Sequence, residues 1–335
     1  MTEGRDYIAT WFYRESHEEA SFYPQAGGMG DSALVHSIYM QILVPFLTTF
    51  HHYNADTKLL FFTNLGAHEL PAFLTRLLLR TEAEIVSVPY TRRPPKGWYK
   101  AWMNQFYLYD ILEAMEKRMK PGDTVLVCDA DCLCRKPLDR LFGEVRRDGS
   151  ALYDIGYPTT YSINGTSMEQ MEGVYSLCYG EPPSKPLRYY GGEFVALRQD
   201  AVAGINREYD RLWQFNLGLP PGGPRIHEEA QMLSLLAERL HIRNSNGNRY
   251  VKRMWTGPRF NNVKPGDENY PVWHLPSEKR RGLYRLYLLL EQERNIRDEA
   301  AFWKKAGEYT GIPHVGLKKR IWDLYTQARM KWQQR

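Results

Sequence analysis

The first half of the chain alternates between two kinds of hydrophobic segment. Short apolar runs, rich in β-branched and aromatic residues, are separated by longer stretches whose apolar residues recur every three or four positions. The predicted strands are residues 7–13, 58–64, 83–90 and 124–127, and the predicted helices are residues 32–50, 69–80 and 96–120. Such alternation predicts an α/β fold, Rossmann-like, in which helices flank a mostly parallel sheet.

The second half predicts fewer regular elements. We expect a strand at 193–198, a helix at 228–240, loops at 156–186 and 244–269, and helices from about residue 279 to the end. Residues 32–55 form the longest uncharged stretch, but it contains Gln41, Pro45 and three histidines, which favours a buried helix over a membrane span. The charged first residues do not resemble a secretion signal, so we expect a cytoplasmic protein.

Charge and cysteine usage refine this expectation. The net charge is +5, yet residues 279–335 alone carry +8, which leaves −3 for residues 1–278. We therefore expect a main α/β domain at 1–278 and a basic, aromatic helical extension at 279–335. Cys128, Cys132 and Cys134 lie in and just after one strand, which favours free thiols over a disulfide framework. Their spacing does not match a structural zinc site, so packing is the simpler interpretation.

Two acids, Asp129 and Asp131, follow the predicted strand at 124–127 directly. Charges are costly to bury unless they are paired or bind a cation, and ligands of parallel sheets bind at the carboxyl ends of the strands. One interpretation is a Mg²⁺ or Mn²⁺ site that holds a nucleotide diphosphate. The alternatives are a capping acid with a surface acid, or a phosphatase-like nucleophile. The last would need a hydroxyl residue where Leu133 stands.

Three later segments, together with the Asp-Ala-Asp, resemble glycosyltransferases of the GT-A fold. They are "YYGGEFVALR" at 189–198, "HEEAQMLSLL" at 227–236 and "VWHLPSEK" at 272–279. The first two are similar to the retaining family of blood-group and α-1,3-galactosyl transferases. The third is similar to glycogenin-like and lipopolysaccharide galactosyltransferases. The resemblance covers residues 6 to 280 and implies hexose transfer from a nucleotide-sugar.

The resemblance implies a donor site on one set of residues. Asp129, Asp131 and His274 would hold Mn²⁺ or Mg²⁺, and Lys279 would neutralise the leaving diphosphate. A packed core imidazole is the alternative for His274. The resemblance also implies contacts to the nucleotide-sugar from Asp129, from Thr10 and Tyr13 at the end of the first strand, and from Lys100. The alternative for Lys100 is a lysine that is simply exposed to solvent.

The resemblance also implies where the reaction occurs. Glu229 would attack the anomeric carbon or stabilise positive charge there, and Glu193 would lie near the sugar hydroxyls. If the configuration is inverted instead, either acid would be the general base. Gly191 and Gly192 would let a sugar approach the strand backbone. The alternatives are a helix-capping acid at 229 and a β-bulge at the glycines.

The C-terminal segment places aromatic and basic residues on one helical face. Trp322, Tyr325, Arg329 and Trp332 follow at helical spacing beside lysines. This pattern fits an anionic membrane surface, and a helix packed on the domain is the alternative. No nucleic-acid-binding module accompanies the charge.

We therefore expect a metal-dependent hexosyltransferase that uses a UDP-sugar, acts on a glycan or glycolipid acceptor with retention, and associates with the inner membrane face. The alternatives are a sugar nucleotidyltransferase and a non-catalytic sugar- or lipid-binding protein.

Overall fold

A six-stranded sheet forms the centre of the computed structural model, which describes residues 4–99, 101–220, 222–257 and 260–333. Its strands, in spatial order, are β5 (Glu84–Ser87), β4 (Lys58–Thr63), β1 (Asp6–Phe12), β6 (Thr124–Cys128), β11 (Tyr190–Arg198) and β8 (Ser150–Asp154). β1 pairs with β6 and β4 with β5 in parallel, whereas β11 is antiparallel to β6 and β8. The predicted α/β fold with a mostly parallel sheet is confirmed.

The chain divides into two compact units, each built from several segments. Unit 1 comprises residues 1–9, 88–128 and 140–248, and unit 2 comprises residues 10–87, 129–139 and 249–335. The two units are described separately below.

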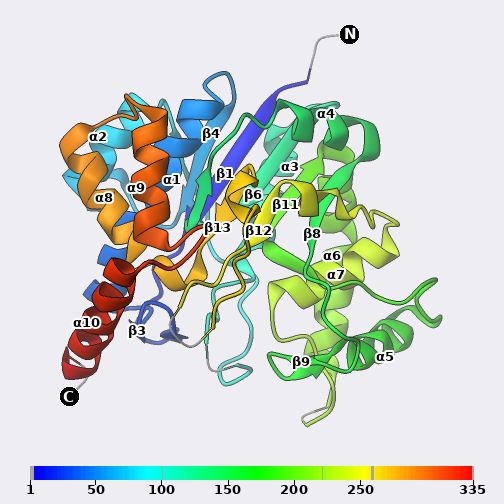
Figure 1. Cartoon of the computed structure of the whole chain (residues 1–335). Coiled ribbons are helices and arrows are strands. Elements are labelled where there is room, and N and C mark those ends of the chain that lie inside the picture. The colour runs from blue at the N-terminus through cyan, green and yellow to red at the C-terminus, as the bar shows by residue number, and fades with distance from the viewer. Residues whose placement is uncertain (1–3, 100, 221, 258–259, 334–335) are drawn as a thin grey trace. The chain divides into compact units, whose positions relative to one another are not determined.

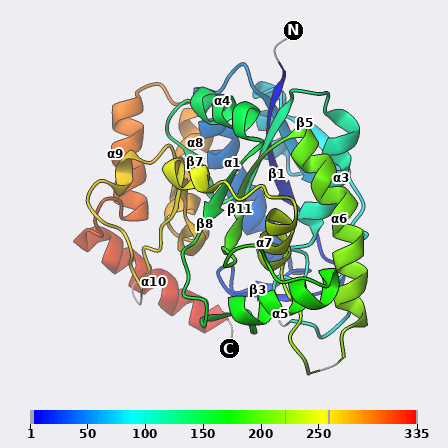
Figure 2. The ribbon, with the colours of Figure 1, turned by 90° about the vertical axis from the view of Figure 1, so that its right-hand side faces the viewer.

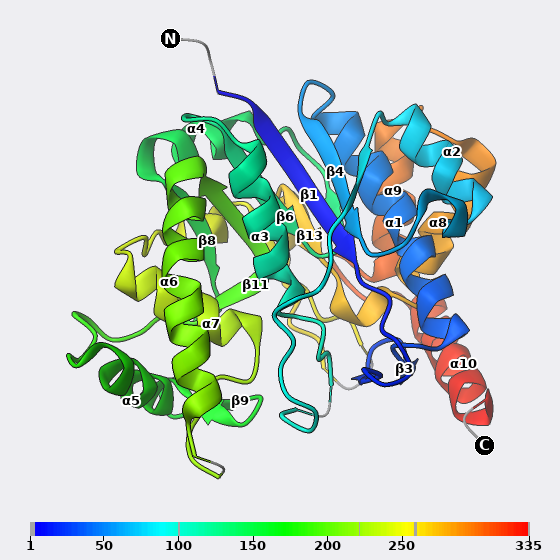
Figure 3. The ribbon, with the colours of Figure 1, turned by 180° about the vertical axis from the view of Figure 1, so that it is seen from behind.

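Unit 1 packs α6 and α7 against β11. Its helices are α3 (Tyr107–Arg118), α4 (Asp139–Asp148), α5 (Met168–Tyr179), α6 (Gln199–Gly218) and α7 (Glu229–Arg239), followed by the 3-10 helix η2 (Ser245–Arg249). Only the first residue of α4 and the last residue of η2 belong to unit 2. A hairpin, β9 (Ser162–Ile163) with β10 (Thr166–Ser167), precedes α5. α3 lies beside α6 (Figure 3), and α7 lies against β11 (Figure 2).

Unit 2 is built around the long helix α1 (Ala33–Tyr53). Figure 1 shows α2 (Ala72–Arg80), α8 (Gly282–Glu293) and α9 (Glu299–Thr310) in the same group of helices, followed by α10 (Leu317–Gln333). Ser32 caps α1 by accepting a hydrogen bond from the Val35 amide at 3.3 Å, as an N-cap serine does. Smaller elements are the hairpin β2 (Phe22–Tyr23) with β3 (Gly28–Met29) and the 3-10 helices η1 (Ala67–Glu69), η3 (Asp267–Asn269) and η4 (Pro276–Glu278).

A second sheet in unit 2 matters most for the site. Its three strands are ordered β12 (Val251–Arg253), β13 (Val272–His274) and β7 (Cys132–Cys134). β13 is parallel to β12 and antiparallel to β7. These strands are only three residues long, and the sequence pattern predicted none of them as strands.

Three predicted boundaries are wrong. The helix expected at 96–120 begins only at Tyr107, because Gly97 and Trp102 adopt left-handed backbone conformations that interrupt a helix before it. The loop expected at 156–186 contains α5, which starts with a capping box between Ser167 and Gln170. The loop expected at 244–269 contains η2, β12 and η3.

Two expectations about the core are confirmed. α1 is long and apolar enough to span a membrane by length and composition, but 67% of that window is buried inside the protein, as expected of a core helix. All four cysteines are free thiols, and Cys128, Cys132 and Cys134 are fully buried.

Candidate metal centre

The Asp-Ala-Asp segment lies at the carboxyl end of β6, as predicted. β6 ends at Cys128, and the chain turns through Asp129 and Asp131 before β7 begins at Cys132. The Cys132 amide donates a hydrogen bond to the Asp129 carbonyl at 3.1 Å, which closes the turn. The turn places both carboxylates beside β7, and both belong to unit 2.

Strand pairing brings His274 to the same place from much later in the chain. In the antiparallel pair of β7 and β13, Cys132 is opposite His274. The Leu275 amide donates to the Asp131 carbonyl at 3.0 Å, which extends the pairing by one residue. The register of two short strands therefore decides that Asp131 and His274 are neighbours.

The three side chains form a compact donor set. The His274 Nε2 atom lies 3.4 Å from Asp131 Oδ1 and 3.9 Å from Asp129 Oδ2. One ligand atom from each residue lies within 4.8 Å of the other two. Asp131 and His274 are buried, whereas the side chain of Asp129 is 38% exposed. The cluster is therefore open to solvent on the Asp129 side.

Lys279 provides the cation that faces Asp131 directly. Its Nζ forms an ion pair with Asp131 Oδ2 and lies 5.8 Å from the centre of the Tyr39 ring. Burial alone would raise the pKa of Asp131, but Lys279 and His274 lower it, and the net shift of the pKa is well downward. Burial likewise opposes the charge on Lys279, yet Asp131 holds its pKa above the usual range. Both groups are therefore charged at neutral pH.

A second buried charge cluster positions the turn that carries Lys279. The preceding residue, Glu278, accepts hydrogen bonds from the Gly282 amide at 2.9 Å and from Lys319 Nζ at 3.0 Å. Lys319 also pairs with Asp323 at 2.7 Å, and all three charged side chains are buried. Burial raises the pKa of Glu278 despite the neighbouring lysine. The first half of α10 is thereby tied to the turn that carries Lys279.

The donor set fits a divalent cation. Two carboxylates and one imidazole are ligands that Mn²⁺ accepts, and Mg²⁺ commonly binds through one or two carboxylates. Asp131 has one oxygen toward His274 and the other toward Lys279, so it can bind a cation without losing its ion pair. Asp129, Asp131 and His274 could therefore hold a divalent metal ion.

Unit 1 contains the predicted reaction residues Glu229 and Gly192. Glu229 is the first residue of α7, where an acid also opposes the helix dipole. A Cβ at Gly192 would lie 2.4 Å from Glu229 Oε1, so the Glu229 carboxylate would have to move. The glycine therefore lets the Glu229 carboxylate lie where it does against the backbone of β11. The predicted approach of a sugar to this backbone stays a prediction.

Gly191 has the same relation to Glu193. A Cβ at Gly191 would lie 2.1 Å from Glu193 Oε2, and Glu193 is buried. The register of β11 against β8 shifts between Gly191 and Val195, so the bulge expected at the glycines is present. The steric role of the glycines and the bulge are therefore both features of this strand.

The predicted donor contacts are distributed as follows. Thr10 is buried in β1 of unit 2, and the Tyr13 hydroxyl donates to the Glu19 carboxylate at 3.0 Å. Lys100 lies outside the described residues. Unit 2 thus holds Thr10, Tyr13 and the metal cluster with Lys279, and unit 1 holds Gly191, Gly192, Glu193 and Glu229.

Sequence reasoning missed two features of the centre. Tyr39 is an unremarkable residue in an apolar helix, and no sequence signal connects its ring with Lys279. Lys319 was expected on a C-terminal helix with its lysines at a membrane surface or in water, but it is buried in an ion pair with Asp323 at helical spacing.

Comparison with known proteins adds no family to these observations: no protein-family model matches the chain, and no curated protein matches it.

Proposed function

We propose that the chain is a metal-dependent glycosyltransferase of the GT-A type, which moves a hexose from a UDP-sugar to a hydroxyl of a glycan or lipid-linked acceptor. The observation that carries the proposal is the cluster of Asp129, Asp131 and His274 directly after β6. The cluster matches the donor site implied by the resemblance, at the sheet edge where α/β proteins bind ligands.

The residues have distinct proposed roles. Asp129, Asp131 and His274 would bind Mn²⁺ or Mg²⁺, which as a Lewis acid stabilises negative charge on the departing diphosphate. Lys279 holds Asp131 ionised and supplies a second positive charge near the diphosphate. Glu229 is the proposed nucleophile or charge stabiliser of a retaining transfer, and Glu193 the proposed contact to sugar hydroxyls.

Calorimetric titration of UDP tests the donor site. Wild type should bind UDP with Mn²⁺ and lose binding in EDTA. Asp129→Asn should weaken metal-dependent binding because it removes a carboxylate ligand from the more exposed side of the cluster. Asp56→Asn, an identical change at an exposed turn of unit 2, should bind like wild type. Equal binding by Asp129→Asn and wild type would remove the cluster from donor recognition.

Product analysis separates the proposal from its rivals. A glycosyltransferase releases UDP from a UDP-sugar when an acceptor is present. Without an acceptor it releases UDP slowly, because the sugar is transferred to water. A nucleotidyltransferase consumes UTP and sugar phosphate and releases pyrophosphate. Metal-dependent UDP binding without turnover of any UDP-sugar would favour a non-catalytic binding protein.

We also propose that α10 associates with an anionic membrane at the cytoplasmic face. Leu317, Ile321 and Leu324 are exposed at steps of four and three residues, so they share one helical face. Trp322 and Tyr325 are 37% and 58% exposed. The side chains of Arg329 and Trp332 lie outside the described residues.

The membrane test must leave the first turns of α10 in place. Truncation before Lys319 would leave Glu278 buried without its cation, so point changes are preferable. Ile321→Asp with Leu324→Asp should abolish binding to anionic liposomes. Leu79→Asp, at an equally exposed leucine of α2, should not. Unchanged liposome binding by the double variant would exclude α10 as the attachment site.

A further inference from the structure

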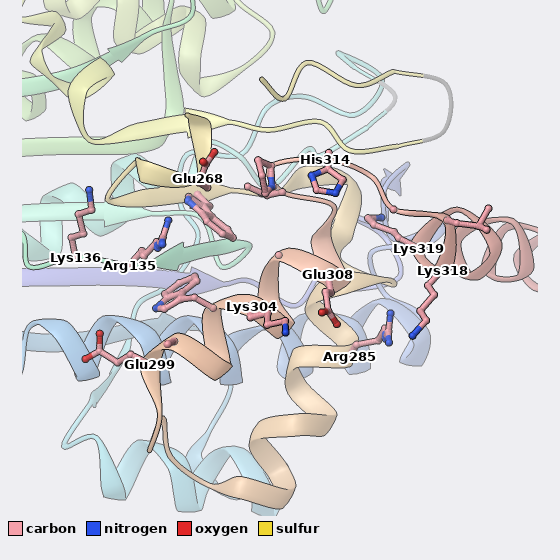
Figure 4. Close-up of a pocket in the computed structure, with 18 of the residues that line it drawn as sticks. Arg135, Lys136, Glu268, Arg285, Glu299, Lys304, Glu308, His314, Lys318 and Lys319 are labelled. Atoms are coloured by element: carbon pink, nitrogen blue, oxygen red, sulfur yellow. The ribbon is translucent and has the colours of Figure 1, made fainter. Parts of the chain in front are cut away.

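Unit 2 contains a large cavity that the proposed transfer does not use. Its volume is about 1170 Å³, above the usual 300–1,000 Å³ of small-molecule sites. It is lined by the end of β7, by β13, by α8 and α9, and by the segment that leads into α10 (Figure 4).

The cavity and the metal cluster lie on opposite faces of the second sheet. Successive side chains of a strand point to opposite faces. Trp273 lines the cavity, and its neighbour His274 belongs to the metal cluster. The cavity is therefore a separate site.

Arg135 is the central cation of this cavity. Its guanidinium carbon lies 5.6 Å from the ring centre of Trp273 and 5.6 Å from that of Trp303. No ion pair to Arg135 forms among the described residues, and its Nη1 atom is buried without a hydrogen-bond acceptor. The Trp273 Nε1 atom is also a buried donor without an acceptor. Arg135 and Trp273 both line the cavity, and neither of these buried N–H donors has an acceptor in the described part of the chain.

The charge of the lining selects an anion. Among the described residues that line the cavity, six lysines and arginines stand against three glutamates. One of these glutamates, Glu299, already accepts from His52 and Tyr53 at 2.9 Å each. Lys319 is neutralised by Glu278 and Asp323, but Lys136, Lys304 and Lys318 make no such pairs in the described part of the chain.

Figure 4 shows how these cations are distributed. Arg135 and Lys136 lie at one end, Lys318 and Lys319 lie at the other, and Lys304 lies between them. The tryptophan rings form apolar surface between the charges. The lining therefore combines hydrogen-bond donors for an anionic group with aromatic surface for an apolar body.

We propose that this cavity binds a phosphate monoester that carries an apolar body, with Arg135 and Trp273 donating to the phosphate oxygens. The ester can be a free metabolite or the headgroup of a lipid, since both present the same chemistry. Lys319 lines the cavity and pairs with Glu278, the residue before Lys279. A ligand in the cavity would therefore lie next to the ion pair that positions the turn facing Asp131.

Binding of phenyl phosphate to the full chain in EDTA tests the proposal without involving the metal site. Wild type should bind phenyl phosphate and should not bind phenol, which lacks the anion. Arg135→Gln should bind about tenfold more weakly or worse, which corresponds to about 1.4 kcal/mol. Lys304→Gln, at an exposed position of α9, should also weaken binding and should fold normally. Arg76→Gln, the same loss of charge at an exposed position of α2, should bind like wild type.

Vesicles distinguish the two sources of the ester. Flotation with phosphatidylcholine vesicles, with and without phosphatidic acid, is compared between wild type and Arg135→Gln. Phosphatidic-acid binding that depends on Arg135 assigns the site to a lipid headgroup, and phenyl phosphate binding alone assigns it to a free ester. Equal binding by Arg135→Gln, Lys304→Gln and wild type, or no binding of either probe by wild type, overturns the proposal. Neither result depends on UDP or on Asp131, so the outcome is independent of the proposed transfer.

Discussion

Loss of the Lys279 ammonium should destabilise the protein strongly in the absence of divalent metal. Asp131 is 1% exposed and Lys279 is 8% exposed, and the two form a direct ion pair. When one partner of a buried pair is removed, the other charge stays buried without compensation, at a cost of about 3–5 kcal/mol. We therefore expect Lys279→Met to lower the free energy of unfolding in EDTA by about this amount. Denaturant titration followed by tryptophan fluorescence measures the change.

Divalent metal should restore part of the lost stability. Without Lys279, Asp131 loses the lysine that offsets its charge, and a cation bound by the cluster would supply positive charge in its place. A ligand that binds only the folded state stabilises it in proportion to the logarithm of its concentration over Kd. Mn²⁺ should therefore raise the unfolding midpoint of Lys279→Met by more than it raises that of wild type.

The matched control is Lys305→Met, which removes a lysine from an exposed ion pair with Glu293 in the same unit. Its stability should differ little from wild type, with or without metal, because exposed pairs contribute little. If Lys279→Met were no less stable than Lys305→Met, the argument from the buried pair would fail. If Mn²⁺ stabilised both proteins equally, a bound cation would not replace the Lys279 charge, and if it stabilised neither, the cluster would not be a cation site.

Three further predictions concern acids and glycines. Glu229→Gln should keep UDP binding and reduce sugar transfer by orders of magnitude. The control Glu169→Gln, in the first turn of α5, should leave transfer unchanged. Near-normal turnover by Glu229→Gln would exclude a catalytic role for Glu229. Gly192→Ala should displace the Glu229 carboxylate and reduce transfer similarly. Gly143→Ala should be tolerated, because its Cβ meets no atom within 4 Å. Equal activities of Gly192→Ala and Gly143→Ala would contradict the steric argument. Burial raises the pKa of Glu15 from 4.5 to about 6, so the folded state holds this proton more tightly than the unfolded chain does. The contribution of Glu15 to stability therefore falls by about 2 kcal/mol as pH rises through this window. Urea unfolding at about pH 4 and about pH 7 should show Glu15→Gln gaining on wild type at the higher pH, and a constant difference would contradict the shift.

Local sequence patterns predicted the elements that carry one half of the metal centre. The β-branched run before Cys128 specifies a strand, and the acids that follow it stand at the carboxyl end of that strand wherever the strand lies in the sheet. The start of α7 at Glu229 was equally predictable, because acids followed by apolar residues at helical spacing mark a helix N-terminus.

Patterns failed where short elements or long-range pairing decided the structure. β7, β12 and β13 are too short for alternation to identify them as strands. The capping box at Ser167 is a local signal of α5, but it lies within a stretch rich in turn residues, which predicts a loop. The stretch before Tyr107 has helical spacing, yet the left-handed residues Gly97 and Trp102 prevent a helix there.

The sequence by itself determined the α/β class, the strand that ends in Asp129 and Asp131, and the free thiols, because these depend on neighbours within a few residues. Only the tertiary structure decided that His274 and Lys279 contact Asp131, and that Arg135 lies between Trp273 and Trp303. Those contacts join residues far apart in the chain. They follow from the register of β7 against β13 and from the packing of α9, which no local pattern specifies.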